Sequence, residues 1–240
     1  MTLGARKFRG SQRVVTFYTR EFGKLEAVAS GIGKPGSSLT GALELFTLSK
    51  LFFAKGRELE RLSQAQVIEG FPSLAGNLRS YAYASWLVEL TARATEPGEA
   101  APELFDRLLT SLRLLAAGLD GALLTAAFAL ELAELLGVAP VLTECTVCAG
   151  ELVGPAWYNA PAGGLVCAAC HRDEPEVWEL SAGHRALLQG LRTLPVDRLP
   201  NLRARPEETA AVLGLARRHL AYHLGFTLKS EAFLRQVEGD

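Results

Sequence analysis

The four cysteines of this 240-residue chain form two identical pairs, and their spacing constrains the fold more than any other feature. Two residues separate the members of each pair, and eighteen residues separate the pairs. Tetrahedral zinc takes four ligands, and a C-x2-C turn presents two thiolates on one small arc, so two such turns complete a site. We therefore expect a zinc ion held by Cys145, Cys148, Cys167 and Cys170.

Two other uses of these cysteines are weighed against zinc. Two disulfides are disfavoured by a reducing cytoplasm, and the sequence shows no signal peptide that would take the chain elsewhere. A redox-active pair opens a helix after a strand, and neither C-x2-C has that setting. Because four thiolates leave no position open for water, we expect a structural zinc and not a catalytic one.

The remaining motifs of the sequence do not predict an enzyme either. Residues 31–36 match G-x-G-x-x-G by letter, but Pro35 stands where a helix should begin and no βαβ pattern surrounds it. His219 and His223 are four residues apart on a predicted helix without a third ligand in sight, so we interpret them as ordinary surface or core histidines. The sequence contains neither a P-loop nor G-x-S-x-G. We expect no catalytic residue; an unrecognised pocket in the helical body is the alternative.

Charge is distributed unevenly along the chain. The net charge is −1, yet residues 1–57 contain ten Lys/Arg and three Glu, which makes this segment +7 and the remainder −8. A basic head on an acidic body is typical of a protein with one face that meets a polyanion, although a solvated lysine-rich surface gives the same pattern.

Aromatic residues are interleaved with this basic segment at Phe8, Phe17, Tyr18 and Phe22. Phosphate neutralisation combined with base stacking is how proteins bind single strands without sequence preference. Such aromatics also fill the core of a small barrel, which is the competing interpretation. A second basic cluster, made of residues 217–218 with Lys229 and Arg235, either extends the surface or is a solvated helix face. We predict DNA contacts at Arg6, Lys7, Arg9, Arg13, Arg20, Lys24, Lys34, Arg217 and Arg218.

The periodicity of apolar residues separates a β-rich head from a helical body. Strand candidates at 14–18, 24–30, 43–53 and 59–71 are joined by turns, which favours a five-stranded barrel of the OB type. Helical periodicity follows at 78–95, 102–117, 120–136, 181–194 and 207–224. We predict a multidomain α+β chain with an OB-fold DNA-binding domain at 1–75, a helical-bundle domain at 76–142 and 176–240, and a zinc-binding insertion, a four-cysteine zinc-finger module, at 143–175.

The sequence gives no sign of a membrane segment. The longest uncharged stretch, 152–171, contains two prolines and three glycines, so it is no lipid-spanning helix. Residues 1–10 contain three basic side chains with no apolar run behind them. We expect a cytoplasmic, nucleoid-associated protein.

Three stretches in a fixed order carry a resemblance to a known family. They are VVTFYTREFGK at 14–24, SLTGALELF at 38–46 and LKSEAFL at 228–234. Together with the order of basic head, helical body, four-cysteine insertion and helical tail, they resemble the bacterial recombination mediator family RecO. The loop after the second strand is commonly rich in Arg and Lys in this family, whereas residues 31–38 offer only Lys34 and the basic charge lies before Val14.

The resemblance implies a non-catalytic role. Members of this family bind single- and double-stranded DNA, anneal complementary strands and bind the tail of single-strand-binding protein (SSB). With the partner RecR they help load the recombinase RecA onto SSB-coated single strands. The alternative is a zinc-ribbon adaptor that binds RNA or a protein partner in transcription or translation.

Overall fold

The structure, a computed structural model, describes residues 1–32, 39–56, 58–172 and 177–239. They form two compact units, one made of Met1–Ala117 with Leu228–Asp240 and the other of Gly118–Thr227. The chain is a mixed α+β protein with an N-terminal sheet and a helical body, as predicted. Within the described residues, every helix is too short or too polar to span a lipid bilayer.

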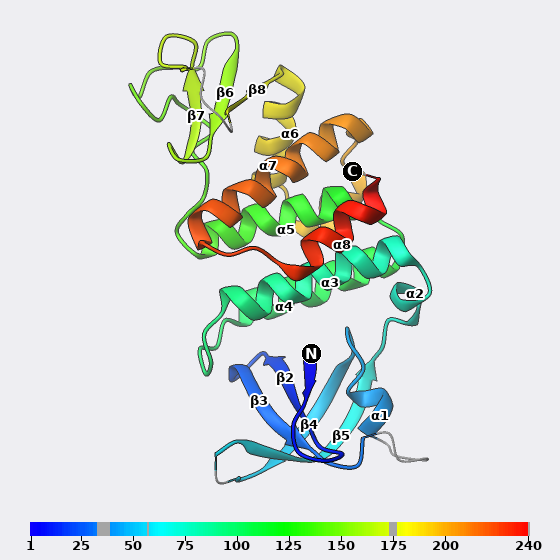
Figure 1. Ribbon diagram of the computed structural model, residues 1–240. Helices are drawn as coiled ribbons and strands as arrows, with labels where there is room; N and C mark the ends of the chain where they lie inside the picture. Colours follow the sequence, from blue (N-terminus) through cyan, green and yellow to red (C-terminus); the bar gives the residue numbers. More distant parts are fainter. Residues whose placement is uncertain (33–38, 57, 173–176, 240) are drawn as a thin grey trace. The chain divides into compact units, whose positions relative to one another are not determined.

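The first unit begins with a five-stranded sheet in the order β1-β2-β3-β5-β4, seen at the bottom of Figure 1. Neighbouring strands are antiparallel except β3 and β5, which are parallel. Among the described residues no ladder joins the edge strands β1 and β4, which meet where the Thr2 N–H donates to the Thr47 carbonyl at 3.2 Å. A closed barrel is therefore not confirmed. The strands are β1 Thr2–Lys7, β2 Arg13–Thr19, β3 Gly23–Ala29, β4 Leu48–Ala54 and β5 Glu60–Glu69.

Strand β2 is buried on both faces, since consecutive residues of a strand point to opposite sides of the sheet. Phe17 of β2 is fully buried and meets Phe53 of β4 edge to face, with ring centroids 6.0 Å apart. Tyr18 is also fully buried and packs on Phe105 of α4 (Pro102–Ala116). The interpretation as a core residue of the sheet is therefore correct for Phe17, whereas Tyr18 is buried on the other face against α4; neither ring is available to a base.

Two sequence predictions for the sheet are wrong. The candidate strand at 43–53 begins only at Leu48, because Phe46 has a φ of +65° and so breaks the extended backbone. The strand β1 was not predicted, since its second half, Ala5–Lys7, carries two charges and no apolar alternation. In both cases, the start of β4 and the strand β1, the local sequence pattern does not reveal the conformation.

Four helices complete the first unit besides α4, and Figure 1 shows the C-terminal helix α8 lying along α3. The side chain of Asn77 caps α3 by accepting the Ser80 N–H at 2.9 Å. Trp86 of α3 donates to Glu231 of α8 at 2.8 Å, which ties the two helices together. The sequence analysis did not predict α8. The four helices are α1 Leu39–Ala42, α2 Pro72–Ala75, α3 Leu78–Ala94 and α8 Lys229–Glu238.

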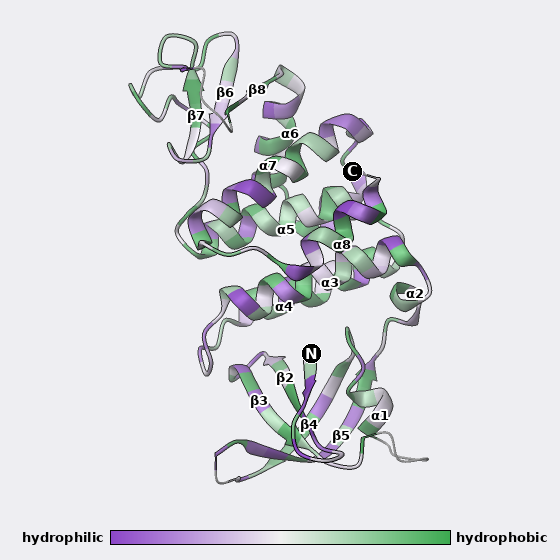
Figure 2. Ribbon diagram, viewed as in Figure 1, coloured by the Kyte–Doolittle hydropathy of each residue, from purple (hydrophilic) through white to green (hydrophobic). Residues whose placement is uncertain are grey.

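The second unit is built around α5 (Gly121–Leu135), which is buried on nearly all sides as predicted. Figure 2 shows this helix mostly in the hydrophobic colour, and its neighbours are α6 and α7. The segment with the cysteines shows neither a helical nor a strand-like period in the sequence, yet it contributes two strands to a three-stranded sheet of order β7-β6-β8. The remaining elements are β6 Ala156–Asn159, β7 Gly164–Cys167, β8 Val177–Leu180, α6 Ala182–Thr193, the 3-10 helix Val196–Asn201 and α7 Pro206–Leu224.

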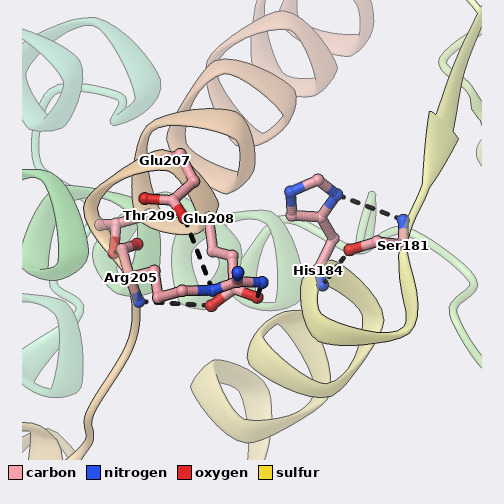
Figure 3. Close-up of polar contacts among 6 residues, drawn as sticks. All are labelled: Ser181, His184, Arg205, Glu207, Glu208 and Thr209. Atoms are coloured by element: carbon pink, nitrogen blue, oxygen red, sulfur yellow. Dashed lines mark hydrogen bonds and ion pairs between the residues drawn. The ribbon is translucent and has the colours of Figure 1, made fainter.

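Reciprocal caps begin α6 and α7, and Figure 3 shows them side by side. The Ser181 hydroxyl accepts the His184 N–H at 3.2 Å, while the Ser181 N–H donates to the His184 ring at 3.3 Å. At α7, the Arg205 N–H and guanidinium donate to Glu208. A Cβ on Gly183 would lie 2.1 Å from a Glu208 carboxylate oxygen, so a larger residue there would displace the Glu208 side chain from this position. These side chains therefore cap their helices, and the His184 ring is bound to the backbone N–H of Ser181.

The two compact units do not coincide with the predicted domain boundaries. α3 and α4, expected in one helical bundle with α5 to α7, fall into the unit of the N-terminal sheet. The division into residues 1–75, 76–142 with 176–240, and 143–175 stays a prediction.

Candidate nucleic-acid interface and candidate metal centre

The four cysteine sulfur atoms lie within 4.8 Å of one another. Cys145 and Cys148 flank one turn, closed by the Ala149 N–H donating to the Cys145 carbonyl at 2.8 Å. Cys167 ends β7, and the Cys170 N–H closes a second turn by donating to the Cys167 carbonyl at 3.0 Å. The sequence prediction that the two pairs come together is confirmed.

The spacing of the sulfurs suits a tetrahedral ion. Zn–S bonds of about 2.3 Å place tetrahedral sulfurs about 3.8 Å apart. The Cys148 and Cys167 sulfurs are 3.9 Å apart. Burial acts to raise the pKa of Cys145, but backbone N–H groups, that of Cys167 foremost, outweigh it and lower the pKa to about 6. Hydrogen bonds with Cys148 and Cys167 raise the pKa of Cys170 to about 12. A zinc ion would bind the cysteines as thiolates and release their protons.

A hydrogen bond from β6 to α7 attaches the small sheet, whose strand β7 ends in Cys167. Tyr158 of β6 hydrogen-bonds through its hydroxyl to Nδ1 of the buried His219, whose Nε2 contacts the Val138 carbonyl. Burial lowers the pKa of His219 to about 4. Both ring nitrogens are therefore engaged within the protein, and the interpretation of His219 as a core histidine is correct.

The predicted basic cluster on α7 consists of two residues in different surroundings. Arg217 is only 8% exposed. Arg218 is exposed, and its guanidinium lies 4.3 Å from the centre of the Trp178 ring. DNA contacts at these two positions stay predictions.

Four predicted cations gather on one hairpin, which we call the basic hairpin (residues 6–13). Arg6 and Lys7 end β1, Arg9 lies in the turn and Arg13 begins β2. All four are exposed. Arg6 forms an ion pair with Glu26 at 3.0 Å, whereas within the described residues no acidic partner is found for the other three.

The register of this hairpin opposes two like charges. Lys7 pairs directly with Arg13 across the β1–β2 ladder. Like charges directly opposite each other destabilise a sheet. A protein that keeps such an unfavourable pair without a structural benefit usually does so at a functional site. A bound polyanion would relieve the repulsion.

A cleft of about 320 Å³ opens beside the basic hairpin. Phe8, which is 37% exposed, forms part of its wall, and the Arg9 guanidinium lies 5.1 Å from the centre of the Phe8 ring. Arg61 lines the cleft from β5, because β5 runs parallel to β3 with Arg61 opposite Val28. Sequence reasoning missed Arg61, since only this pairing brings it to the hairpin. The cleft is lined by Phe8, Arg9, Gln12, Val28, Gly56, Glu58, Leu59 and Arg61.

Two other predicted cations lie at the opposite end of β2 and β3, and both have partners within the protein. Arg20 is paired with Asp106 of α4. Lys24 donates to the carbonyls of Ala92, at 2.7 Å, and Thr95 at the end of α3. DNA contacts at Arg20 and Lys24 stay predictions of the sequence, and these internal partners compete with them; Lys34 lies outside the described residues.

Tight backbone packing holds the turn between β2 and β3 in place. Gly23 has a φ of +63°, and a Cβ there would lie 1.9 Å from the Glu99 carbonyl oxygen. Only glycine allows this approach. The turn between β2 and β3 is thus docked on the segment between α3 and α4.

The chain matches known proteins over nearly its whole length. Residues 1–71 match the family model described as Recombination protein O N terminal, and residues 75–232 match Recombination protein O C terminal. The chain is similar to DNA repair protein RecO of Pelotomaculum thermopropionicum, with 38% identity over 98% of this chain and 91% of that protein. It is also similar to DNA repair protein RecO of Listeria monocytogenes serotype 4b (31%, covering 96% and 90%) and of Halalkalibacterium halodurans (29%, covering 95% and 89%).

Proposed function

Since the chain belongs to the RecO family of DNA repair proteins, we propose that it binds single- and double-stranded DNA and anneals complementary strands in recombinational repair. The observation that carries the DNA-binding part is the cleft beside the basic hairpin. It combines an exposed ring, Phe8, with the cations Arg9 and Arg61, and the hairpin adds Lys7 and Arg13. Aromatic rings next to cations bind single strands through base stacking and phosphate neutralisation.

Annealing of this kind requires no nucleotide and no catalytic residue. Two complementary strands repel each other through their phosphates, and a basic surface lowers that repulsion while the bases search for register. Three cations of the hairpin without an acidic partner in the described part of the chain are suited to this task. We therefore assign a non-catalytic role.

The proposed DNA-binding domain is an OB-type barrel. The strand order β1-β2-β3-β5-β4, with its parallel β3–β5 pair, supports this proposal. The backbone hydrogen bond between Thr2 and Thr47 joins the two edge strands at one point. In such a barrel the β1–β2 and β4–β5 loops border the oligonucleotide-binding face, and these are the loops that line the cleft.

We further propose that the four cysteines hold a structural zinc ion. A zinc ion would replace thiol protons by metal–sulfur bonds and thereby stabilise the two turns, since such sites contribute on the order of 10 kcal/mol to folding. The small sheet buries apolar side chains, with Tyr158 and Leu165 fully buried, but it has only three strands of four residues each, so a metal is a reasonable second source of stability.

Family membership alone supports the proposed protein partners. On that basis we propose that the chain binds RecR and the tail of SSB and acts on RecA indirectly, by helping to load it onto SSB-coated strands. None of these partners is needed for the annealing step itself.

An annealing assay tests the proposed function. Two complementary oligonucleotides carrying a fluorophore and a quencher are mixed with the protein, without nucleotide, at low and moderate salt. Acceleration that fades with salt is the expected result, because each phosphate contact releases a counterion. No acceleration by folded, zinc-loaded protein would contradict the proposal, and a preference for structured RNA would favour an RNA-binding adaptor.

A further inference from the structure

Strand β4 carries two consecutive phenylalanines on opposite faces of the sheet. Phe53 packs in the core against Phe17, whereas Phe52 is 44% exposed. The ladder has a bulge here: Phe53 pairs with Leu62 and Phe52 with Gln64, and the skipped Ser63 donates from its hydroxyl to the Phe52 carbonyl at 2.8 Å. Because Phe53 enters the core and consecutive residues of a strand point to opposite faces, Phe52 lies on the solvent side; the bulge sets which residue of β5, Gln64, lies opposite it.

The side chains around Phe52 form a defined surface. Lys50 is two residues before it on the same face, and its ammonium lies 5.4 Å from the centre of the Phe52 ring. Gln64 is opposite Phe52, and Gln66 is opposite Lys50. We call this surface the outer β4–β5 face; it consists of Lys50, Phe52, Gln64 and Gln66.

The chemistry of this face fits a single-stranded nucleic acid. An exposed ring offers a platform on which any base stacks, and a lysine beside it offers a phosphate contact. The two glutamines add donors and acceptors for base edges. The acidic residues of β5 lie at the ends of the strand, where Glu69 is held by Arg113 at 2.6 Å and Glu60 begins the strand. The centre of the face thus carries positive charge.

The outer β4–β5 face is connected to the cleft through one residue. Arg61 lines the cleft and also belongs to β5, the strand that carries Gln64 and Gln66. Ala54, opposite Arg61, lies two residues beyond Phe52 on β4. A strand leaving the cleft at Arg61 therefore reaches Phe52 without leaving the sheet.

We propose that single-stranded DNA bound in the cleft continues over the outer β4–β5 face, with a base stacked on Phe52 and a phosphate at Lys50. This inference rests on the proposed function. It makes the binding site longer than the cleft and assigns Phe52, Lys50 and the two glutamines as DNA contacts, none of which the sequence analysis identified. A protein partner is disfavoured because a cation and two amides surround the ring.

Affinity for oligothymidines of two lengths tests the inference. Probes of about 5 and about 15 nucleotides bracket the site sizes found for one OB-type domain. Phe52→Ala is expected to weaken binding of the long probe at least about fivefold, which is the lower limit for loss of one stacked base, and to leave the short probe unchanged. Lys50→Gln is expected to reduce the magnitude of the slope of log K against log salt concentration for the long probe by about 0.7.

Phe22→Ala is the matched control, since Phe22 is 68% exposed and lies at the end of β2 away from the basic hairpin. It is expected to bind both probes like the unchanged protein, and Phe8→Ala is expected to weaken both. Unchanged long-probe affinity for Phe52→Ala, or an equal loss for Phe22→Ala, overturns the inference while the proposed function stands.

Two further outcomes are distinguished by the same measurements. If neither probe binds the unchanged protein, the proposed function itself fails. If Phe52→Ala binds DNA normally but abolishes a self-association seen for the unchanged protein by analytical ultracentrifugation, the face is a protein interface and the inference is overturned.

Discussion

Arg20 of the β2–β3 turn and Asp106 of α4 form a two-point ion pair: Nε and one terminal nitrogen of the guanidinium lie 3.0 Å from the two carboxylate oxygens. The hydrogen bond from Arg20 lowers the pKa of Asp106, so the pair stays charged at neutral pH. Arg20 therefore presents a compensated charge to solvent, unlike Arg9 on the basic hairpin.

This difference predicts unequal effects on DNA binding. Arg9→Gln is expected to lower the slope of log K against log salt for single-stranded DNA by about 0.7, whereas Arg20→Gln should leave it nearly unchanged. Fluorescence anisotropy titrations at several salt concentrations give both slopes. Equal reductions for the two variants would show that Arg20 leaves Asp106 to bind phosphate.

Loss of one cysteine is expected to unfold the small sheet of the second unit. Cys145 is 1% exposed, and Cys145→Ser removes the ligand deepest in the cluster. Metal content should fall from about one zinc per chain, and the thermal transition of the second unit should be lost or strongly lowered. Ala168→Ser, in the exposed part of the second turn, is the control and should keep its zinc.

DNA affinity should largely survive Cys145→Ser, because the basic hairpin and the cleft belong to the other compact unit. Complete loss of DNA binding in a variant whose first unit remains folded would mean that the cysteine module is itself a DNA surface.

The buried His219 predicts a specific pH dependence of stability. Burial lowers its pKa to about 4 in the folded protein, below about 6.5 for an unfolded chain. The unfolded state therefore takes up the proton first, and stability present above pH 6.5 is lost as the pH falls towards 4. Between pH 7 and pH 5 the loss from this group is about 2 kcal/mol.

Chemical denaturation at the two pH values, compared with His219→Gln, isolates this contribution. The variant should be less stable at pH 7, because the contacts with Tyr158 and Val138 are altered, but its loss between pH 7 and pH 5 should be smaller. An identical pH dependence in both proteins would assign the acid sensitivity to other groups, the cysteine cluster foremost.

The helix α8 depends on a carboxylate from another helix. Glu89 of α3 accepts the N–H groups of Lys229, at 2.9 Å, and Ser230, at 2.7 Å, and so caps α8. Burial acts to raise the pKa of Glu89, but these hydrogen bonds outweigh it and lower the pKa. Glu89→Ala is expected to destabilise the docked helix by about 1 kcal/mol, the usual effect of losing an N-cap.

Hydrogen exchange measures this effect directly. Amides in residues 230–238 should lose protection in Glu89→Ala, while Glu96→Ala, an exposed position past the end of α3, should leave them unchanged. Unchanged protection in Glu89→Ala would show that apolar contacts, such as those of the fully buried Leu234, suffice to hold α8.

The features that sequence analysis predicted well depend on short spacings. Two C-x2-C turns predict a cluster because each pair is fixed by its own turn, and the helical periods of α3 to α7 are strong enough to survive tertiary packing. By contrast α8 has ten residues, too short a pattern for periodicity to mark it reliably.

Long-range pairing decided what sequence analysis missed. Arg20 is bound by Asp106, 86 residues away, and Arg61 reaches the cleft only through the β3–β5 ladder. Gln64 lies opposite Phe52 only because a bulge at Ser63 shifts the register of the β4–β5 ladder. Which of several similar cations meets solvent is therefore set by partners that one segment cannot reveal.

The most direct test of the account is the salt dependence of single-stranded DNA binding by a variant of the basic hairpin. With Lys7, Arg9 and Arg13 all changed to Gln, the slope of log K against log salt should decrease in magnitude by about 2, about 0.7 for each phosphate that is no longer neutralised. The fold should persist, since all three side chains are exposed and Lys7 and Arg13 no longer oppose each other. An unchanged slope in the folded variant would contradict the assignment of this hairpin as the DNA surface.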